Sequence, residues 1–394
     1  MKEKEKLVGN AVRQEKSRKR AKASVATLIL LAVLVVILIA TGAVEKMSDT
    51  ENLSKEFAEF LGVETQESGF PVSFSTNDIM DVKTKGDDLY VLTKNFVTPV
   101  NKKGQTLQPQ QITYAQPALK TNGDYAIVFD RLSNKYILIN KKGEYEQRQD
   151  ANGSQILDAA VTQKGEVMLS LSSTSSSSIL HIVDKKGEDV FIWSCGEEYI
   201  VSFDMSGDTV YCAALGAYGG EVYTKLYVLD MSEQETVCEY TLHGSACIEL
   251  KHLSGDKFSV LCDDALYICK AKKEETVVKK VTFDAKMLFF STDSQGNTAV
   301  IFEDNENFSK ERLSVFDNDA DIVYSVSVDE NILDLSLDGK EVCLLYENAI
   351  KTVTSGGKEA EELHFTGKCT GVVAVGEKIY CYSLGGVEKA VRDK

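Results

Sequence analysis

Short apolar strands alternate with turns along most of this chain, and the turns recur at a regular spacing. Beyond residue 68 the apolar runs are four to eight residues long, and no long helical period appears. A glycine turn followed by a strand occurs eight times, at Gly86, Gly123, Gly165, Gly207, Gly255, Gly296, Gly339 and Gly376. The mean spacing of about 41 residues predicts a repeat architecture.

A second, polar turn follows each glycine turn by about twenty residues. It reads NKKGQ (101–105), NKKGE (140–144) and DKKGE (184–188) in the first three repeats and is degenerate in later ones. The strand before this turn is apolar, and the strand after it is more polar. Four strands in about 40 residues are typical of a β-propeller blade, whose outermost strand is solvated.

The eighth repeat lacks a strand. Only GVEKAVRDK (386–394) follows its second strand, whereas SGFPVSFST (68–76) is a strand without a repeat of its own. A strand shared between the two ends of the domain would close the ring and remove exposed sheet edges. We therefore predict an all-β, eight-bladed β-propeller over residues 68–394. A seven-bladed ring with one miscounted unit and an open β-solenoid are the alternatives.

An uncharged run of twenty residues, 25–44, precedes the repeats. At about 1.5 Å per residue a helix of this length crosses the hydrocarbon core of a bilayer. The tail 1–24 is basic, and Lys/Arg-rich flanks stay cytoplasmic, so the C-terminal domain is expected outside the plasma membrane. The membrane-orienting residues are Lys16, Arg18, Lys19, Arg20 and Lys22. A signal peptide cleaved near Ala40–Gly42 is the alternative, although its apolar region would be unusually long.

Residues 45–67 form a linker between this span and the repeats. Ser48 and Glu51 fit a capping box, and apolar residues from Leu53 to Leu61 fall on one helical face before Gly62. The linker is expected to contain a short amphipathic helix, which acts as a stalk or docks on the domain.

The charge distribution is polarised along the chain. Lys+Arg total 44 and Asp+Glu total 60, which gives a net charge of −16. Residues 1–24 hold nine basic and three acidic residues, so the remainder holds 44 − 9 = 35 basic and 60 − 3 = 57 acidic residues, a net −22. An acidic body lacks the cationic footprint of nucleic-acid binding, so no nucleic-acid partner is predicted.

The sequence contains no recognisable catalytic motif. Its nine cysteines include no CxxC pair, and most lie within apolar strands, which favours buried free thiols over a zinc or redox site. The four histidines belong to different repeats, and the glycine-rich segment 216–221 has no adjoining helix to hold phosphate. No catalytic residue and no cofactor are predicted.

Asp317, Asp319 and Asp321 resemble the beginning of a calcium-binding loop. The segment lacks the loop glycine and the distal glutamate, and it occupies the position of the NKKG turn in other repeats. It is interpreted as an acidic turn, with calcium binding as the weaker alternative.

Four acidic residues, Asp81, Asp158, Glu249 and Asp334, lie in the predicted innermost strands in the pattern I-x-D or I-E. Inner strands line the central channel of a propeller, so these carboxylates are candidates for holding a cation or a basic ligand group. Their offsets to the next glycine differ, which favours solvated channel walls over a single cluster.

The connections between second and third strands are expected to lie on one face of the ring. Three of them are long, at 172–179, 214–225 and 303–312, whereas the opposite face has only tight turns. Function concentrates on such loops, and aromatic residues often anchor interfaces. Tyr218, Tyr223 and Phe308 are therefore candidate partner-binding residues, or else they cover the ends of the blades.

The KKG-E/Q turns after "ILIN" and "HIVD" loosely resemble the repeats of quinoprotein-type propellers. The tryptophan expected near the end of each such repeat occurs once, as Trp193, so a quinone cofactor is not carried over. The whole layout resembles a family of Gram-positive bacterial proteins classed as a domain of unknown function. These have a basic tail, one span, a short helix and "FPVSF" opening a propeller-like domain. This resemblance implies topology and fold, and no activity.

Three functions fit these observations. The first is a non-enzymatic binding or scaffold module of the cell envelope, which presents its long-loop face to a protein or a cell-wall polymer. The second is an enzyme acting on an envelope carbohydrate through two channel-mouth carboxylates. The third is a sensor that signals through the span to a cytoplasmic partner.

Overall fold

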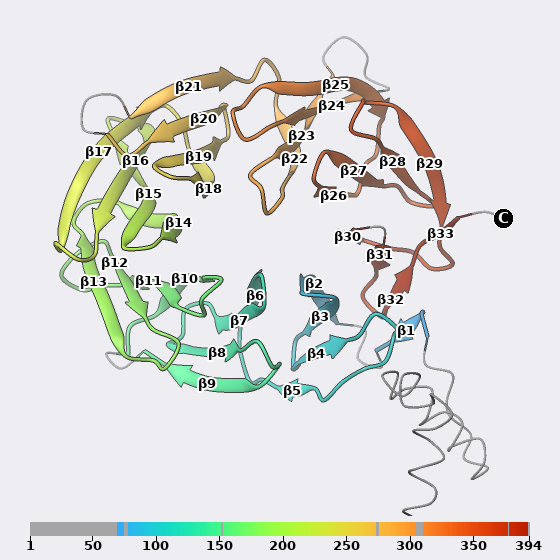
Figure 1. Ribbon diagram of the computed structural model, residues 1–394, viewed down its shortest axis with the longest axis horizontal. Helices are drawn as coiled ribbons and strands as arrows, with labels where there is room; N and C mark the ends of the chain where they lie inside the picture. The colour runs from blue at the N-terminus through green and yellow to red at the C-terminus, as the bar shows by residue number, and fades with distance from the viewer. Residues whose placement is uncertain are drawn as a thin grey trace, which may run out of the picture. The chain divides into compact units, whose positions relative to one another are not determined.

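Eight β-sheets stand around a common centre in the described part of the chain (Figure 1). The computed structural model describes residues 69–74, 78–150, 153–272, 276–304, 310–376 and 378–392. The chain divides into two units, 1–68 and 69–394, and every described residue belongs to the second. The predicted eight-bladed β-propeller is confirmed, and the seven-bladed ring and the solenoid are wrong.

Each blade is an antiparallel sheet whose strands follow one another from the inside of the ring outward. Blade 1 consists of β2 (Ile79–Lys85), β3 (Asp88–Thr93), β4 (Phe96–Val100) and β5 (Gln110–Gln111). Blade 2 consists of β6 (Pro117–Asn122), β7 (Tyr125–Asp130), β8 (Lys135–Ile139) and β9 (Tyr145–Gln149). Blade 3 consists of β10 (Ile156–Val161), β11 (Val167–Ser172), β12 (Ser178–Val183) and β13 (Asp189–Cys195). Blade 4 consists of β14 (Tyr199–Ser206), β15 (Thr209–Tyr218), β16 (Glu221–Asp230) and β17 (Glu235–His243).

The remaining blades repeat this order, with additions in the last two. Blade 5 consists of β18 (Cys247–Ser254), β19 (Lys257–Cys262), β20 (Ala265–Lys270) and β21 (Val277–Thr282). Blade 6 consists of β22 (Met287–Thr292), β23 (Thr298–Glu303), β24 (Lys310–Phe316) and β25 (Ile322–Asp329). Blade 7 consists of β26 (Asp334–Asp338), β27 (Glu341–Leu345), β28 (Ile350–Val353), β29 (Glu359–His364) and β33 (Val391–Arg392). Blade 8 consists of β30 (Gly371–Val375), β31 (Lys378–Tyr382), β32 (Gly386–Lys389) and β1 (Val72–Ser73).

The ring is closed by a strand from each end of the propeller. β1 pairs antiparallel with β32, with Val72 opposite Val387 and Ser73 opposite Gly386. The predicted sharing of the eighth blade between the two ends is confirmed, although β1 is shorter than the predicted strand 68–76. β33 was not predicted: after β32 the chain crosses to blade 7 and adds a fifth strand there, opposite Leu363 and His364.

The hydrophobic core lies between neighbouring blades. One cluster, for example, joins Phe129 and Leu138 of blade 2 to Ile156 and Leu169 of blade 3. A second strand such as β7 is buried along its whole length because blades cover both of its faces. An outer strand such as β13 alternates between exposed and buried residues. This arrangement explains the outward decay of hydrophobicity in each repeat.

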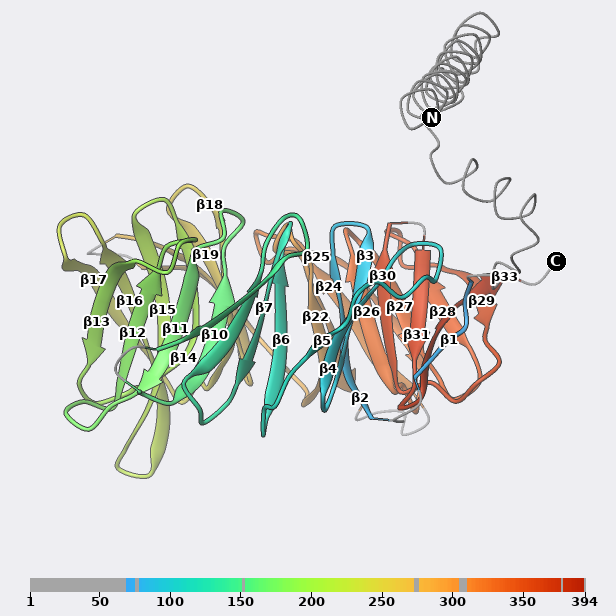
Figure 2. The same cartoon turned by 90° about the horizontal axis from the view of Figure 1, so that it is seen from below.

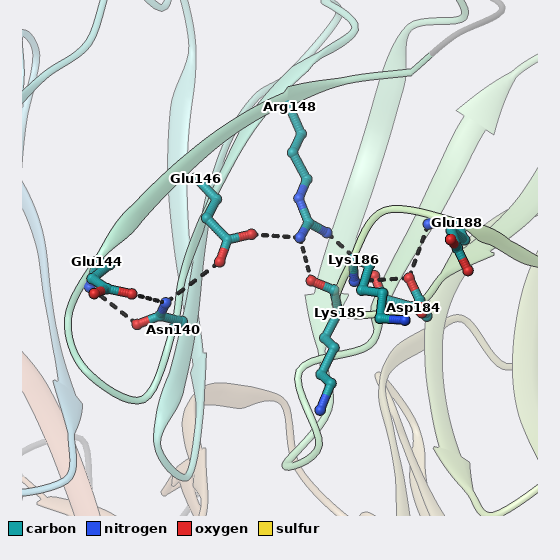
Figure 3. Close-up of polar contacts among 8 residues, drawn as sticks. All are labelled: Asn140, Glu144, Glu146, Arg148, Asp184, Lys185, Lys186 and Glu188. Carbon is teal, nitrogen blue, oxygen red and sulfur yellow. Dashed lines mark hydrogen bonds and ion pairs between the residues drawn. The ribbon is translucent and has the colours of Figure 1, made fainter.

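The polar turn between third and fourth strands is held by its first side chain. Asn140 Oδ1 accepts a hydrogen bond from the backbone N–H of Lys142 at 2.9 Å. It accepts a second from the backbone N–H of Glu144 at 3.1 Å (Figure 3). Asp184 caps the N–H groups of Lys186 and Glu188 in the same way. Gly143 adopts a φ of 80°, a conformation that glycine reaches without steric cost. The N/D-K-K-G motif therefore encodes this turn.

No helix among the described residues is long and apolar enough to cross a membrane. The predicted span 25–44, the basic tail and the linker helix all lie outside the described residues.

Candidate functional site on the loop face

The antiparallel order of the blades gives the ring two different faces. The inner strands begin on one face, which also carries the connections between second and third strands; we call it the loop face. The glycine turns and the polar turns lie on the opposite side, the turn face. In the edge-on view, the β15–β16 hairpin extends beyond the other blades on the lower side, which is the loop face (Figure 2).

Inner strands carry a β-bulge close to the loop face in five of the blades. In each, one apolar residue is inserted between two paired residues: Met80, Leu157, Val201, Ile248 and Leu288. A bulge re-aims the side chain of the inserted residue. Met80 is 51% exposed and Ile248 is 39% exposed, and Leu333, at the equivalent place in blade 7, is 42% exposed. Apolar side chains therefore surround the centre of the loop face.

Further exposed apolar side chains lie on the same face, in connections and at strand ends. They are Leu132, Tyr199, Tyr218, Val222 and Leu384. Together with Met80, Ile248 and Leu333 they form what we call the apolar loop-face surface. Scattered exposed apolar residues are normal, but a concentration on one face indicates an interaction site.

The long connection 214–225 is not a loop, as the sequence had suggested, but a hairpin. β15 and β16 pair out to Tyr218 and Glu221, and Gly219 and Gly220 form the turn. Tyr218 at its tip is 85% exposed. Phe308 lies outside the described residues.

Tyr223 holds the hairpin to the ring. Its ring lies against Gly216, where a Cβ atom would approach the Tyr223 ring to 2.3 Å. Its hydroxyl donates to Glu198 Oε1 at 3.0 Å, and the Tyr227 hydroxyl donates to Glu198 Oε2 at 2.9 Å. Glu198 is buried, and Cys195 also contacts Oε2, at 3.6 Å. Glu198 was not predicted to have a structural role, because in the sequence it resembles any exposed acidic residue of a turn.

The four acidic residues of the inner strands occupy equivalent positions, each directly after the apolar bulge position. They lie in blades 1, 3, 5 and 7, so a blade with another residue type separates each from the next. Asp158 forms an ion pair with Lys120 of blade 2 at 2.5 Å. Asp81 accepts a hydrogen bond from the N–H of Val82 and lies 3.5 Å from Lys83 Nζ. Each carboxylate thus has its own local environment.

Asp334 and Glu249 differ from the other two. Asp334 Oδ2 accepts the N–H of Val372 in blade 8 at 2.9 Å. Burial raises the pKa of Asp334, although the backbone hydrogen bonds that it accepts and the charge of Lys83 act in the opposite direction. Glu249 Oε2 is buried and makes no hydrogen bond to the described residues.

Short polar side chains link neighbouring inner strands around the ring. Ser202 Oγ accepts the N–H of Leu250 at 2.8 Å, and Asp204 Oδ2 accepts that of His252 at 2.9 Å. Ser336 and Asp338 of blade 7 do the same for two N–H groups of blade 8. Inner-strand N–H groups have no further strand to bond, so these side chains satisfy them. Asp204, whose pKa is raised by burial, is not among the residues predicted from the sequence.

Asp317, Asp319 and Asp321 point to different partners. Asp317 Oδ1 accepts the N–H groups of Asp319 and Asp321, as in the other polar turns. Asp319 pairs with Lys257 at 2.5 Å and Asp321 with Lys279 at 2.7 Å. Within the described ranges, no group of three or more Asp, Glu, His or Cys residues could hold a metal ion.

All nine cysteines are buried free thiols. Burial raises the pKa of Cys195 to about 11 and that of Cys269 to about 12, so these thiols stay protonated near neutral pH.

An open pocket of about 740 Å³ lies on the loop face between blades 7 and 8. Its walls include Leu333, Tyr346, Lys351, Lys368 and Glu362. It adjoins the apolar loop-face surface through Leu333.

A family model described as a family of unknown function (DUF5711) matches residues 64–389. The chain belongs to this family. No curated protein matches the sequence.

Solved structures similar to this chain are distant in sequence. BamB from Moraxella catarrhalis is 12% identical, with a TM-score of 0.51 over 82% of this chain and 98% of BamB. Sqt1 from Saccharomyces cerevisiae is 9% identical, with a TM-score of 0.55 over 83% of this chain and all of Sqt1 (100%). The C-terminal WD40 domain of Sif2 is 10% identical, with a TM-score of 0.58 over 84% and 98%. At these identities the likeness shows the fold alone.

Proposed function

We propose that this protein is a membrane-anchored binding module that presents its loop face to a protein partner in the cell envelope, outside the membrane. The observation that carries the proposal is the apolar loop-face surface, which surrounds the centre of one face and includes the protruding tip residue Tyr218. Buried aromatic and aliphatic anchors contribute most of the binding energy in protein interfaces. The anchor itself rests on the apolar run 25–44 and its basic flank.

The inner-strand acids support binding rather than catalysis. Two-carboxylate hydrolysis needs a pair of free carboxyl groups flanking a substrate. Asp334 already accepts a backbone N–H, Asp158 is paired with Lys120, and the four acids lie on alternate blades.

The test places a photoreactive amino acid at Tyr218 or Met80 of the full chain in living cells. We expect irradiation to crosslink the same envelope protein from both positions. With the photoreactive residue at Tyr218, Met80→Ser and Ile248→Ser should lower the crosslinking yield. With it at Met80, Tyr218→Ser and Ile248→Ser should do so.

Matched controls come from the turn face, where Leu107 is 43% exposed and Ile322 is 60% exposed. Leu107→Ser and Ile322→Ser should leave the yield unchanged. Equal loss with the control variants, or capture of the same proteins from turn-face positions, would overturn the proposal. Capture of a cell-wall polymer instead would reassign the partner class.

A further inference from the structure

Three consecutive blades carry a pair of exposed lysines at the same position of the turn face. The pairs lie in the polar turns of blades 1, 2 and 3, and we call them the lysine arc: Lys102, Lys103, Lys141, Lys142, Lys185 and Lys186. The polar turns of blades 4, 6 and 7, all of whose residues are described, have no such pair, whereas that of blade 5 carries Lys270 and Lys272. Blades 1, 2 and 3 are thus adjacent blades that share the feature.

The turns that carry the arc are rigidly held. The side chains of Asn101, Asn140 and Asp184 cap two backbone N–H groups each in their own turns. Arg148 of blade 2 donates to the carbonyl oxygens of Asp184 and Lys185 in blade 3, which ties two of the turns together. Lys185 points away from this guanidinium (Figure 3). The backbone is fixed while the ammonium groups extend outward.

Carboxylates lie among the lysines of the arc. Glu144 accepts a hydrogen bond from Asn140 Nδ2 at 2.8 Å, and Glu146 pairs with Arg148 at 2.6 Å. Lys141 and Asp124 lie 3.6 Å apart, but both side chains are more than half exposed, so this ion pair is weak. Lys102, Lys141, Lys142, Lys185 and Lys186 are exposed, which leaves them accessible to an anionic ligand.

The first described residues of the chain lie against the polar turn of blade 1, which carries one pair of arc lysines. A Cβ atom on Gly104, next to Lys103, would lie 2.6 Å from the carbonyl carbon of Gly69, so the segment 69–70 passes over this turn. Residues 45–68, which number 24, connect this point to the end of the predicted span. Fully extended they reach about 80 Å, and less if part is helical. The blade 1 end of the arc therefore lies beside the point where the described chain begins.

We propose that the lysine arc binds the phosphate groups of anionic lipids in the membrane that anchors the chain, so that the turn face lies toward the bilayer. This inference rests on the membrane anchoring in the proposed function. Clustered lysines beside a membrane attract anionic headgroups over roughly one Debye length. The chain beyond residue 24, with a net charge of −22 that includes the arc, is repelled as a whole by the same surface, so the arc selects which side approaches. The loop face is then directed away from the bilayer, where a partner reaches it.

The experiment uses the full chain in nanodiscs of phosphatidylcholine alone or with phosphatidylglycerol. A water-soluble acylating reagent labels lysines, and mass spectrometry measures the rate at each. We expect Lys102, Lys141, Lys142, Lys185 and Lys186 to react at least about threefold more slowly in the phosphatidylglycerol discs at low salt, and the difference to vanish at roughly 1 M salt. Lys368 and Lys286, which are 87% and 72% exposed, are the controls and should react equally in both.

Equal labelling of the arc in both kinds of disc would overturn the proposal. Protection by soluble poly(glycerol phosphate) in phosphatidylcholine discs, without protection by phosphatidylglycerol, would overturn the lipid assignment in favour of a soluble polyanion. Failure of the anchor is detected separately, because an unanchored chain would be released from native membranes by alkaline carbonate. If the chain stays in the membrane after carbonate treatment but the arc lysines are not protected from labelling, only the lipid binding proposed for the arc is refuted.

Discussion

The hydroxyl of Tyr223 donates a 3.0 Å hydrogen bond to Glu198 Oε1, which joins the longest hairpin of the ring to the connection between blades 3 and 4. Tyr227 donates to the other oxygen of the same carboxylate. One buried acid therefore sets the position of the hairpin that carries Tyr218.

Replacing Glu198 with alanine should destabilise the ring and release the hairpin. The change leaves the Tyr227 hydroxyl buried without its acceptor, and hydrogen bonds to a charged group contribute about 1.5–3 kcal/mol each. A lower urea midpoint at unchanged m-value, together with faster amide exchange in 214–225, would show this. Glu197→Ala is the matched control, because Glu197 is exposed beside it. An equal effect of the two changes would contradict the assignment.

Asp334→Asn should stabilise the protein at neutral pH and change the pH dependence of its stability. Burial raises the pKa of Asp334 in the folded state above its unfolded value. The native state then holds the proton more tightly, so its contribution to stability is complete below about pH 4 and is lost as the pH rises through the folded pKa. Asparagine still offers an oxygen to the N–H of Val372 and carries no charge.

Urea unfolding of wild type and Asp334→Asn between pH 4 and pH 7 tests this. The advantage of the variant should be absent at the acidic end, grow with pH and then level off. Asp334→Ala also removes the acceptor and should be about 1–2 kcal/mol less stable than Asp334→Asn at all of these pH values. An Asn variant less stable than wild type at pH 7 would mean that the carboxylate is stabilising there.

Shortening Val72 should weaken ring closure. Val72 is buried together with Val387 and Tyr380. Val72→Ala removes two carbon atoms from this contact and leaves a cavity, which should lower the free energy of unfolding by about 2 kcal/mol. Val391→Ala in β33 is the control, since Val391 is 59% exposed in the strand that merely extends blade 7. Calorimetry on both variants measures the difference, and equal melting temperatures would argue against a closing role for β1.

Arg148→Met should loosen the polar turn of blade 3. The guanidinium is largely buried and bonds two carbonyl oxygens and Glu146, so its loss should cost about 2 kcal/mol. Amide exchange at 184–188 should rise while that at 101–105 stays unchanged. Arg131→Met, at an exposed position, serves as the comparison. Unchanged exchange at 184–188 would show that Asp184 alone holds the turn.

The repeat count and the ring closure could be predicted because they rest on local signals. All eight predicted turn glycines adopt positive φ, from 55° at Gly376 to 87° at Gly165. The environments of the inner-strand acids could not be predicted, since partners such as Lys120 and Val372 come from neighbouring blades. The hairpin 214–225 was mistaken for a loop because Gly216, Gly219 and Gly220 resemble loop residues, whereas Gly216 is needed for the Tyr223 ring.

The bulges have a recognisable signal in the sequence. In the I-x-D pattern the middle residue is apolar, as in Met80 before Asp81, and two successive apolar residues break the alternation of a strand. The exposure of Met80 and Ile248 follows from that break, and with it the apolar loop-face surface.

The strand that closes the ring is also the first described strand after the predicted anchor. If the chain is anchored as proposed, tension between the membrane and the ring acts first on the segment 69–70, which lies against the Gly104 turn of blade 1, and then on β1, which pairs with β32 at Val72 and Ser73. If β1 is pulled away, blade 8 loses its outer strand and β32 becomes an open edge that can pair with another chain. The sheet that closes the ring is therefore the first sheet of the propeller that a force along the tether would open.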